Sequence, residues 1–213
     1  MTPRNLGVLA WLGVAAPIVY VAAVIVGGAS IAGYDHVRDP ISSLTEAGRT
    51  GVEGIRFLFL TYNLLVAAFG AWALATSPRG PWRHAFTLLI LTAVCGLLMG
   101  PFAQDPIGAP TTVAGLVHIV LAAIESLSTI VMVALSLYAF RASGWRRLGW
   151  FAAICLAVIV PCGLAAAAAT AGHWQTMGLF ERLTIGAFEA WLAIVALHMA
   201  LRPASLAVTG GGA

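Results

Sequence analysis

The sequence contains no lysine and few charged residues of any kind. All 11 basic residues are arginines, and charged residues make up 9% of the 213-residue chain, against 61% for apolar residues. Soluble domains carry about 25% charged residues, so this composition excludes an ordinary soluble protein. A helix needs about 20 apolar residues to cross a bilayer. The chain is long enough for six such helices with short connections, and we expect no separate soluble domain.

Cysteine is also scarce, and its spacing excludes the usual roles of paired thiols. Cys95, Cys155 and Cys162 lie in apolar segments, which argues against disulfides and against a thiolate zinc site. The sequence also lacks H-E-x-x-H, G-x-S-x-G, a phosphate-binding loop and a dinucleotide fingerprint. We therefore expect no metal and no cofactor, although a metal site assembled from histidines and acidic residues of separate outer segments stays open.

The apolar runs and the turn residues between them predict an all-α fold, a polytopic integral membrane bundle of six transmembrane helices. We place these helices at about 7–31, 55–77, 84–103, 113–140, 148–171 and 181–201. Residues 1–203 then form a single domain. The residues that follow, 204–213, are rich in glycine, and we expect them to form a disordered tail.

Arginine placement predicts the orientation of the bundle. The side of the membrane that is richer in basic residues is normally cytoplasmic, which places both termini in the cytoplasm and the protein in a plasma membrane of the bacterial type. The richer side holds Arg4, Arg79, Arg83, Arg141, Arg146, Arg147 and Arg202. Because the arginines are scattered at helix ends, the net charge of +3 gives no reason to expect nucleic acid as a partner.

The longest predicted connection, residues 32–54, contains the segment Asp39-Pro40-Ile41-Ser42-Ser43-Leu44. An aspartate N-cap followed by a proline at the first helical position is a typical helix start. We expect a short interfacial helix with Ile41 and Leu44 on its buried face and Gly48 at its end. This connection would cover the outer end of the bundle as a lid.

Two glutamates within the predicted helices are the main candidate catalytic residues. Glu125 and Glu189 fall in the hydrocarbon region, where an ionised carboxylate costs about 3 kcal/mol even on generous insertion scales. Both should therefore face the interior of the bundle. A carboxyl group in a low dielectric favours its neutral form, which suits a general acid, a proton carrier or a plain buried hydrogen bond.

Other polar residues are expected near the outer face. His118, a further candidate catalytic residue, shares a helix face with Glu125, about 10 Å away along the axis. We expect an outward-opening polar pocket, in which arginines pair with carboxylates or bind an anionic head group. Its further members are the candidate catalytic Asp39 and Asp105 and the candidate substrate-binding Arg56, Asn63, Glu181, Arg182 and Trp191. The alternatives are that Asp39 is only an N-cap, Asp105 a turn former and His118 a packing residue.

Several short segments together resemble a known family. They are Asp39-Pro40-Ile41-Ser42-Ser43-Leu44, Gly100-Pro101-Phe102-Ala103-Gln104-Asp105, His118, Gly178-Leu179-Phe180-Glu181-Arg182 and Trp191. Over nearly the whole chain they resemble the bacterial membrane family called domain of unknown function 998. Its members look like six-helix bundles with an aspartate in the first outer loop, an aspartate after helix three, a histidine in helix four and a Glu-Arg pair opening helix six. Asp39, Asp105, His118, Glu181 and Arg182 match these places, but the family name supplies no activity.

The chain is also similar in type, without a shared motif, to small actinobacterial membrane terpene cyclases, which protonate an alkene or epoxide with a buried carboxylic acid. Our leading hypothesis is a membrane enzyme that acts on a lipid or isoprenoid by proton-initiated cyclisation or isomerisation. Glu125 or Glu189 would be the acid, and the available aromatic walls are Phe59, Tyr62, Phe188 and Trp191. The alternatives are a small proton-linked transporter, a ligand-binding membrane sensor, or a structural partner subunit. The oligomeric state does not follow from the sequence.

Overall fold

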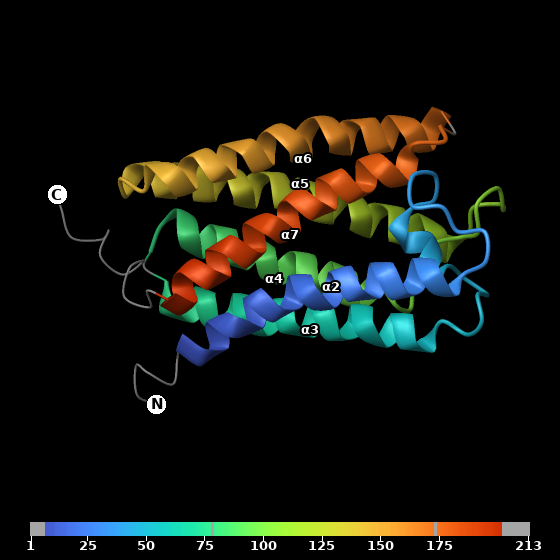
Figure 1. The fold of residues 1–213 in the computed structure, drawn as a ribbon, viewed down its shortest axis with the longest axis horizontal. Helices are drawn as coiled ribbons and strands as arrows, with labels where there is room; N and C mark the ends of the chain where they lie inside the picture. Colours follow the sequence, from blue (N-terminus) through green and yellow to red (C-terminus); the bar gives the residue numbers. More distant parts are fainter. Residues whose placement is uncertain (1–6, 78, 173, 202–213) are drawn as a thin grey trace.

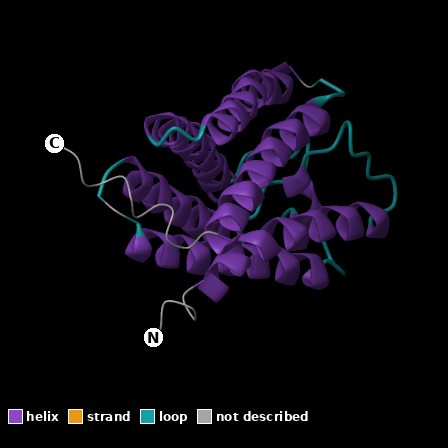
Figure 2. Cartoon of the chain, turned by 60° about the vertical axis from the view of Figure 1, so that its left-hand side comes forward, coloured by secondary structure: helices purple, strands orange, loops and turns teal. Residues whose placement is uncertain are grey.

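The computed structural model describes residues 7–77, 79–172 and 174–201, and within these ranges it contains helices and no strand (Figure 1 and Figure 2). Six of the described helices are long and apolar enough to cross a membrane. They are α2 (Ala10–Ser30), α3 (Glu53–Thr76), α4 (Pro81–Met99), α5 (Val113–Ala142), α6 (Arg146–Gly172) and α7 (Met177–Leu201), accompanied by two short 3-10 helices, η1 (Gly7–Leu9) and η2 (Ile41–Thr45). The predicted six-helix membrane bundle is confirmed. The predicted tail at 204–213 lies outside the described residues.

Both ends of α4 differ from the predicted ends, and both differences have local causes. α4 begins at Pro81, three residues before the predicted start, because proline suits the first helical position, where its missing N–H is not needed. The same helix ends at Met99, four residues early. Pro101 follows closely and has no N–H with which to continue the helical hydrogen bonds.

The six helices form a closed ring. Each long helix packs against the one before it in the chain, and α7 packs back against α2 (Figure 1). The end of the bundle at which α2 begins and α7 ends is called the hairpin end, because it also holds the short α3–α4 and α5–α6 connections. The opposite end is called the strap end, after the strap, residues 31–52, that covers it.

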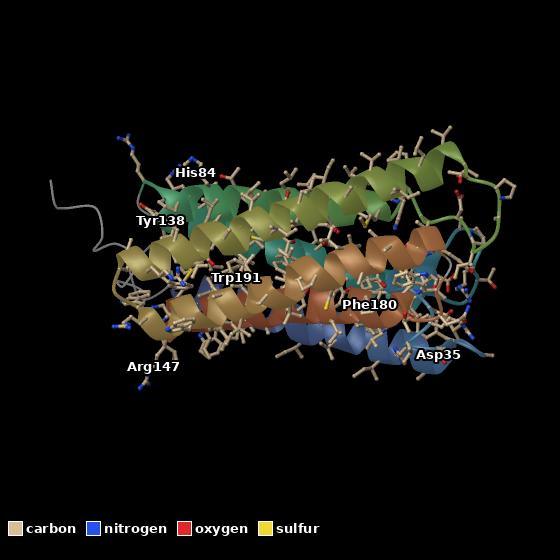
Figure 3. All side chains as sticks on the ribbon, turned by 90° about the horizontal axis from the view of Figure 1, so that it is seen from above. Asp35, His84, Tyr138, Arg147, Phe180 and Trp191 are labelled. Carbon is tan, nitrogen blue, oxygen red and sulfur yellow. The ribbon has the colours of Figure 1, made fainter. Side chains whose placement is uncertain are left out.

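Aromatic side chains fill the ring interior toward the hairpin end. Trp82 stacks on Phe86 with 5.6 Å between ring centroids, and it packs edge-on against Phe140 at 4.9 Å. Trp191 lies midway along the bundle (Figure 3), fully buried, and its Nε1 donates a hydrogen bond to Ser136 Oγ at 2.8 Å. This packing closes the interior on the hairpin side.

The outward faces of the helices are apolar. Ile25, Phe57, Leu127 and Leu164 are each at least 60% exposed, and large exposed apolar surfaces of this kind mark contact with a membrane. Charged side chains gather at the two ends, as Asp35 and Arg147 illustrate (Figure 3). The bundle is therefore a multi-pass membrane protein.

The strap contains the predicted short helix, as η2, with Ile41 and Leu44 buried. The prediction that Asp39 caps this helix is wrong: Pro40 precedes it, and among the described residues no side chain caps it. The reason is that the Asp39 carboxylate is bound by its neighbour Arg38. η2 ends at Thr45, before the turn that contains Gly48.

Candidate functional site

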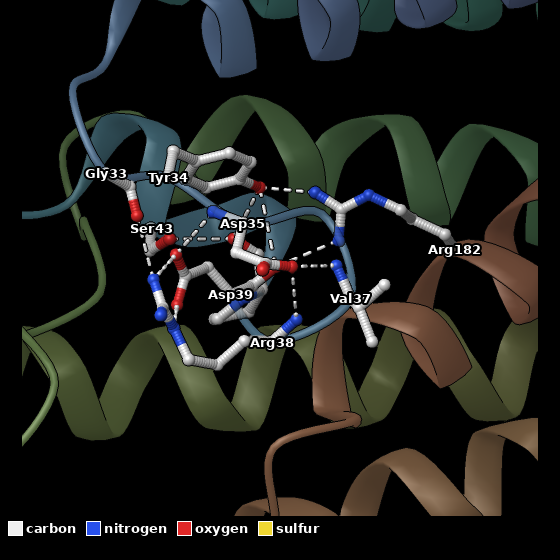
Figure 4. A network of polar contacts seen from close by, with 9 residues as sticks. Gly33, Tyr34, Asp35, Val37, Arg38, Asp39, Ser43 and Arg182 are labelled. Atoms are coloured by element: carbon white, nitrogen blue, oxygen red, sulfur yellow. Dashed lines mark hydrogen bonds and ion pairs between the residues drawn. The ribbon is translucent and has the colours of Figure 1, made fainter.

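A network of polar contacts holds the strap in shape (Figure 4). Arg38 Nε lies 2.7 Å from Asp39 Oδ1, and Asp39 Oδ2 accepts hydrogen bonds from Arg38 Nη2 and from the Asp35 amide at 2.8 and 2.9 Å. The Arg38 hydrogen bond lowers the pKa of the Asp39 carboxyl below its ordinary value. The amides of Val37 and Arg38 likewise lower the pKa of Asp35. Both carboxylates serve the structure of the strap.

Arg182 of α7 connects the strap to the bundle. Its Nη1 donates to the backbone oxygens of Asp39 and Gly178 at 2.8 and 2.9 Å, and its Nη2 donates to the Tyr34 hydroxyl. The guanidinium carbon lies 5.5 Å from the centre of the Tyr34 ring, and burial raises the pKa of the Tyr34 hydroxyl. The Arg182 Nε is buried and has no hydrogen-bond partner among the described residues.

Glu181, next to Arg182, holds the strap as well. Its Oε2 accepts a hydrogen bond from the amide of Ile41 at 2.5 Å. Gly178 donates its amide to the Arg38 carbonyl at 3.3 Å. A glycine is required there, because a Cβ atom would lie 2.3 Å from the backbone oxygen of Asp39. The Glu-Arg pair that opens α7 therefore anchors the strap.

The described residues do not show the ion pairs considered for the two arginines in the predicted pocket. Arg182 binds carbonyl and hydroxyl oxygens, and Arg56 is exposed, donating only to the backbone oxygens of Glu46 and Arg49 at 3.4 Å. Asp39 pairs instead with its neighbour in sequence, and Glu46 pairs with Arg49 at 2.5 Å. Pairing with an arginine close in sequence is favoured over pairing with a distant one, because closing a short loop costs little conformational entropy.

Three helices meet at the carboxyl group of Glu189. This residue of α7 is 4% exposed, and Tyr62 of α3 donates from its hydroxyl to Glu189 Oε1 at 2.5 Å. Tyr20 of α2 packs on the Tyr62 ring with 4.8 Å between centroids. The Glu189 Oε2 atom is buried and has no hydrogen-bond partner among the described residues. One oxygen of this carboxyl is thus held, and the other is unpaired.

Glu125 reaches the same interior from α5. Its side chain is half-buried, and it shares a helix face with Leu121 and Ser128, which are both buried. The inward orientation predicted for both glutamates is therefore what the structure shows.

Glu189 lines a pocket of about 350 Å³ between α2 and α7. The α2 wall includes Val21 and Ile25, which are 50% and 60% exposed on the outer surface of the ring, so the pocket is open sideways to the surrounding hydrocarbon. The α7 wall is lined by small residues, including Gly186 and Ala190. The pocket is thus an apolar groove with one buried carboxyl group in its wall.

The pocket exists because α2 and α7 touch at one end and separate toward the other (Figure 1). Near the hairpin end Gly13 of α2 approaches Ala196 of α7 so closely that a Cβ atom would lie 2.7 Å from the Ala196 Cβ. Toward the strap end the helices diverge, and Ile41 of the strap closes the opening beside Arg182.

Asp105 and His118 lie outside this pocket. Asp105 Oδ2 accepts from the Thr112 amide and its Oδ1 from the Thr112 hydroxyl, both at 2.8 Å. His118 Nδ1 lies 2.9 Å from the carbonyl oxygen of Phe102. Both side chains fix the α4–α5 connection, which supports the structural alternatives considered for them.

Asn63 and Trp191 also pack within the bundle. Asn63 donates to the Phe59 carbonyl at 2.9 Å. Its Oδ1 lies against Gly96 of α4, where an added Cβ atom would be only 2.2 Å away. The contact between Asn63 and Gly96 therefore lets α3 and α4 approach closely. Trp191 belongs to the core. The aromatic residue of the pocket wall is Tyr20, which the sequence analysis missed. A tyrosine in the middle of an otherwise apolar helix was the available signal.

The predicted outward-opening polar pocket is present only in part. A polar pocket of about 250 Å³ lies under the strap, lined by Tyr34, Asp39, Glu46 and Arg49 among others, but its lining does not include Glu125 or His118. Within the described ranges, no three histidine, cysteine, aspartate or glutamate side chains are grouped so that they could hold a metal ion.

Comparison with known proteins identifies a family. Residues 14–198 match the model of a family described as Protein of unknown function (DUF998), a span that begins in α2 and ends in α7. No curated protein sequence and no solved structure matches the chain. The match confirms the family resemblance that the short segments indicated, and the chain belongs to the DUF998 family.

Proposed function

We propose that this protein is a membrane enzyme that acts on a lipid or isoprenoid by acid catalysis at Glu189. The observation that carries the proposal is the Glu189 carboxyl group, which lies in the wall of a lipid-facing apolar pocket. One of its oxygens is bound to Tyr62, and the other is buried with no partner in the part of the chain that the structure describes. The pocket volume of about 350 Å³ falls in the range of about 300–1,000 Å³ that is typical of small-ligand sites.

The proposed chemistry is an isomerisation or cyclisation that needs no co-reactant. Protonated Glu189 gives its proton to one carbon of a substrate double bond, which forms a C–H bond and leaves a carbocation. In an isomerisation this cation loses a proton from an adjacent carbon. In a cyclisation a second double bond of the substrate adds to the cation, and the resulting cyclic cation loses a proton. In both cases the carboxylate of Glu189 takes up the lost proton, which restores the acid, and the product is an isomer of the substrate.

The surroundings of Glu189 suit this reaction. The Tyr62 hydroxyl donates to the carboxylate that forms after proton transfer, and fixed donors aimed at developing charge lower the barrier. The ring of Tyr20 in the pocket wall can stabilise a nearby cation. The pocket is otherwise lined mainly by apolar side chains, which keep water away from the cation.

A proton-linked transporter is the second candidate, and the observation that favours it is that two carboxyl groups, those of Glu125 and Glu189, turn toward the interior of the bundle. The aromatic packing around Trp82 and Phe140 disfavours it, because a transported ligand would need a path through the hairpin half of the ring.

Orientation and location are part of the proposal. The strap end faces the outside of a bacterial plasma membrane, because the hairpin end carries the larger number of arginines. Single cysteines at Gly48 and Ser143, in a chain without its own three, test this with a reagent that cannot cross membranes. In intact cells the Gly48 cysteine should react and the Ser143 cysteine should not; the reverse pattern would contradict the orientation.

The catalytic proposal is tested by mass spectrometry of lipid extracts from cells fed polyprenyl precursors. The cells express the intact chain, Glu189→Gln, Glu125→Gln, or the control Glu53→Gln, which makes the same change at an exposed site at the start of α3. A new isomer should appear with the intact chain and the control and disappear with Glu189→Gln. Undiminished product with Glu189→Gln would refute the role of this residue, and extracts that match those of cells without the protein would favour transport or sensing.

A further inference from the structure

We propose further that the pocket between α2 and α7 binds a single-chain amphiphile in one orientation, with an oxygen-bearing head group beside Arg182 and its chain directed toward the hairpin end. The position of the reacting bond rests on the proposed function, whereas the binding itself does not depend on catalysis.

The two ends of the pocket differ in chemistry. Arg182 lines it at the strap end, while Pro17 and Ala193 line it at the hairpin end. Arg182 and Ala193 are 11 residues apart on one helix, which corresponds to about 16 Å at 1.5 Å per residue. A ligand that matches this groove is polar at one end and apolar along the rest of its length.

Arg182 determines the kind of head group. A guanidinium group has only donors, and the Arg182 Nε is buried without a partner among the described residues. The nearest carboxylates are engaged elsewhere, since Asp39 binds Arg38 and Glu181 binds the Ile41 amide. Three of the five N–H groups donate to Asp39, Gly178 and Tyr34, so an alcohol or phosphate oxygen at the strap end of the pocket would accept from one of the two that remain.

The spacing along α7 selects the reacting bond. Arg182 and Glu189 both line the pocket and stand seven residues apart, about 10 Å along the helix. A ligand whose head group sits beside Arg182 therefore presents to Glu189 a carbon about 10 Å further along its chain. The substrate class is a prenyl alcohol or prenyl phosphate that reacts at an internal double bond rather than at the one next to the head group.

The size of the groove favours a lipid chain over a helix of a partner protein. An α-helix with its side chains is about 10 Å wide and rises about 5.4 Å per turn. A single turn of such a helix would already occupy more than the 350 Å³ of the pocket. A single prenyl chain is thin enough to extend along the whole groove.

Gly186 offers a way to fill the groove without disturbing the protein. It lines the pocket, and a Cβ atom added there would meet no other atom within 4 Å. Gly186→Leu therefore places a side chain in the space proposed for the ligand. Gly54→Leu is the matched control, because Gly54 is also helical, also has open space around its Cβ position, and lies outside the pocket.

Native mass spectrometry of the purified full chain tests binding with farnesene, farnesol and farnesyl phosphate, which share a chain and differ in head group. Farnesol and farnesyl phosphate should bind about tenfold or more tightly than farnesene, the effect of a hydrogen bond to a charged group. Gly186→Leu should weaken binding of all three, and Gly54→Leu should not. Equal affinities for the three probes, or undiminished binding by Gly186→Leu, would overturn the proposal.

A further pair of variants separates the head-group contact from the anchoring of the strap. Arg182→Gln removes the guanidinium, whereas Glu181→Gln weakens the strap anchor and leaves Arg182 in place. Only Arg182→Gln should abolish the preference for oxygen-bearing head groups, and an equal loss in both variants would assign the preference to the strap. Binding of the probes is measured without any product being formed, so a failure of the catalytic proposal leaves this binding test intact.

Discussion

Replacing Gly13 with alanine should destabilise the bundle, whereas the same replacement at Gly186 should not. At Gly13 the new Cβ would lie 2.7 Å from the Ala196 Cβ and 2.7 Å from the Phe69 ring, and both neighbours are fully buried. Overpacking of this kind costs about 1–3 kcal/mol. Alanine also gains about 1 kcal/mol over glycine in a helix, but this gain is common to both sites. The difference between the two variants is therefore about 1–3 kcal/mol in favour of Gly186→Ala.

Thermal unfolding of the purified chain in one detergent, followed by tryptophan fluorescence, measures this difference. For chains of this length 1 kcal/mol shifts the midpoint by about 2–4 °C, so Gly13→Ala should unfold about 2–12 °C below Gly186→Ala at the same scan rate. If Gly13→Ala unfolded at or above the midpoint of Gly186→Ala, the close crossing of α2 and α7, and with it the origin of the pocket, would be refuted.

Three more predictions concern the site and the strap. Tyr62→Phe should lower product formation about tenfold or more without weakening farnesol binding, because the Glu189 carboxylate loses its donor; an unchanged rate would remove Tyr62 from the mechanism. Arg38→Gln should raise the pKa of Asp39 toward its ordinary value of about 3.9. The stabilisation from this ion pair is full above the ordinary pKa and is lost as the pH falls through the lowered one, so a carboxyl NMR titration should show a lower midpoint in the intact chain than in the variant. Gly178→Ala should push the strap away from α7 and speed the hydrogen exchange of strap amides, while the helix content measured by circular dichroism stays unchanged. Unchanged exchange of the strap amides would show that the close approach of the strap to Gly178 is not needed.

The six-helix fold could be predicted because a bilayer leaves the backbone few choices. Every N–H and C=O in the hydrocarbon must be bonded within the segment, so long apolar runs become helices. The glutamates were identified for a related reason, since an acid such as Glu189 is tolerated in this environment only when it turns inward. The start of α4 was also available from the sequence, because Pro81, three residues before the predicted start, suits the first helical position.

The pocket itself could not be predicted, because it depends on which helices are neighbours. Periodicity shows which face of α7 carries Arg182, Gly186 and Glu189, but not that this face meets α2, from the other end of the chain. The residues that we expected in a single polar pocket lie in separate places, for a simpler reason. Asp39, Asp105 and His118 each find a partner within 16 residues along the chain, and such short-range contacts close at little entropic cost.

Ring closure makes α7 the last wall of the site to be built. The other long helices of the described chain are synthesised before α7. Until α7 is inserted, no helix packs against the α2 face that carries Tyr20, and the Tyr62 hydroxyl of α3 lacks the Glu189 carboxyl as its acceptor. The helix that completes the ring also brings Glu189, the one carboxyl group among the described residues that line the pocket. A nascent chain stalled before α7 would thus hold five of the described membrane helices and no carboxyl group at this seam.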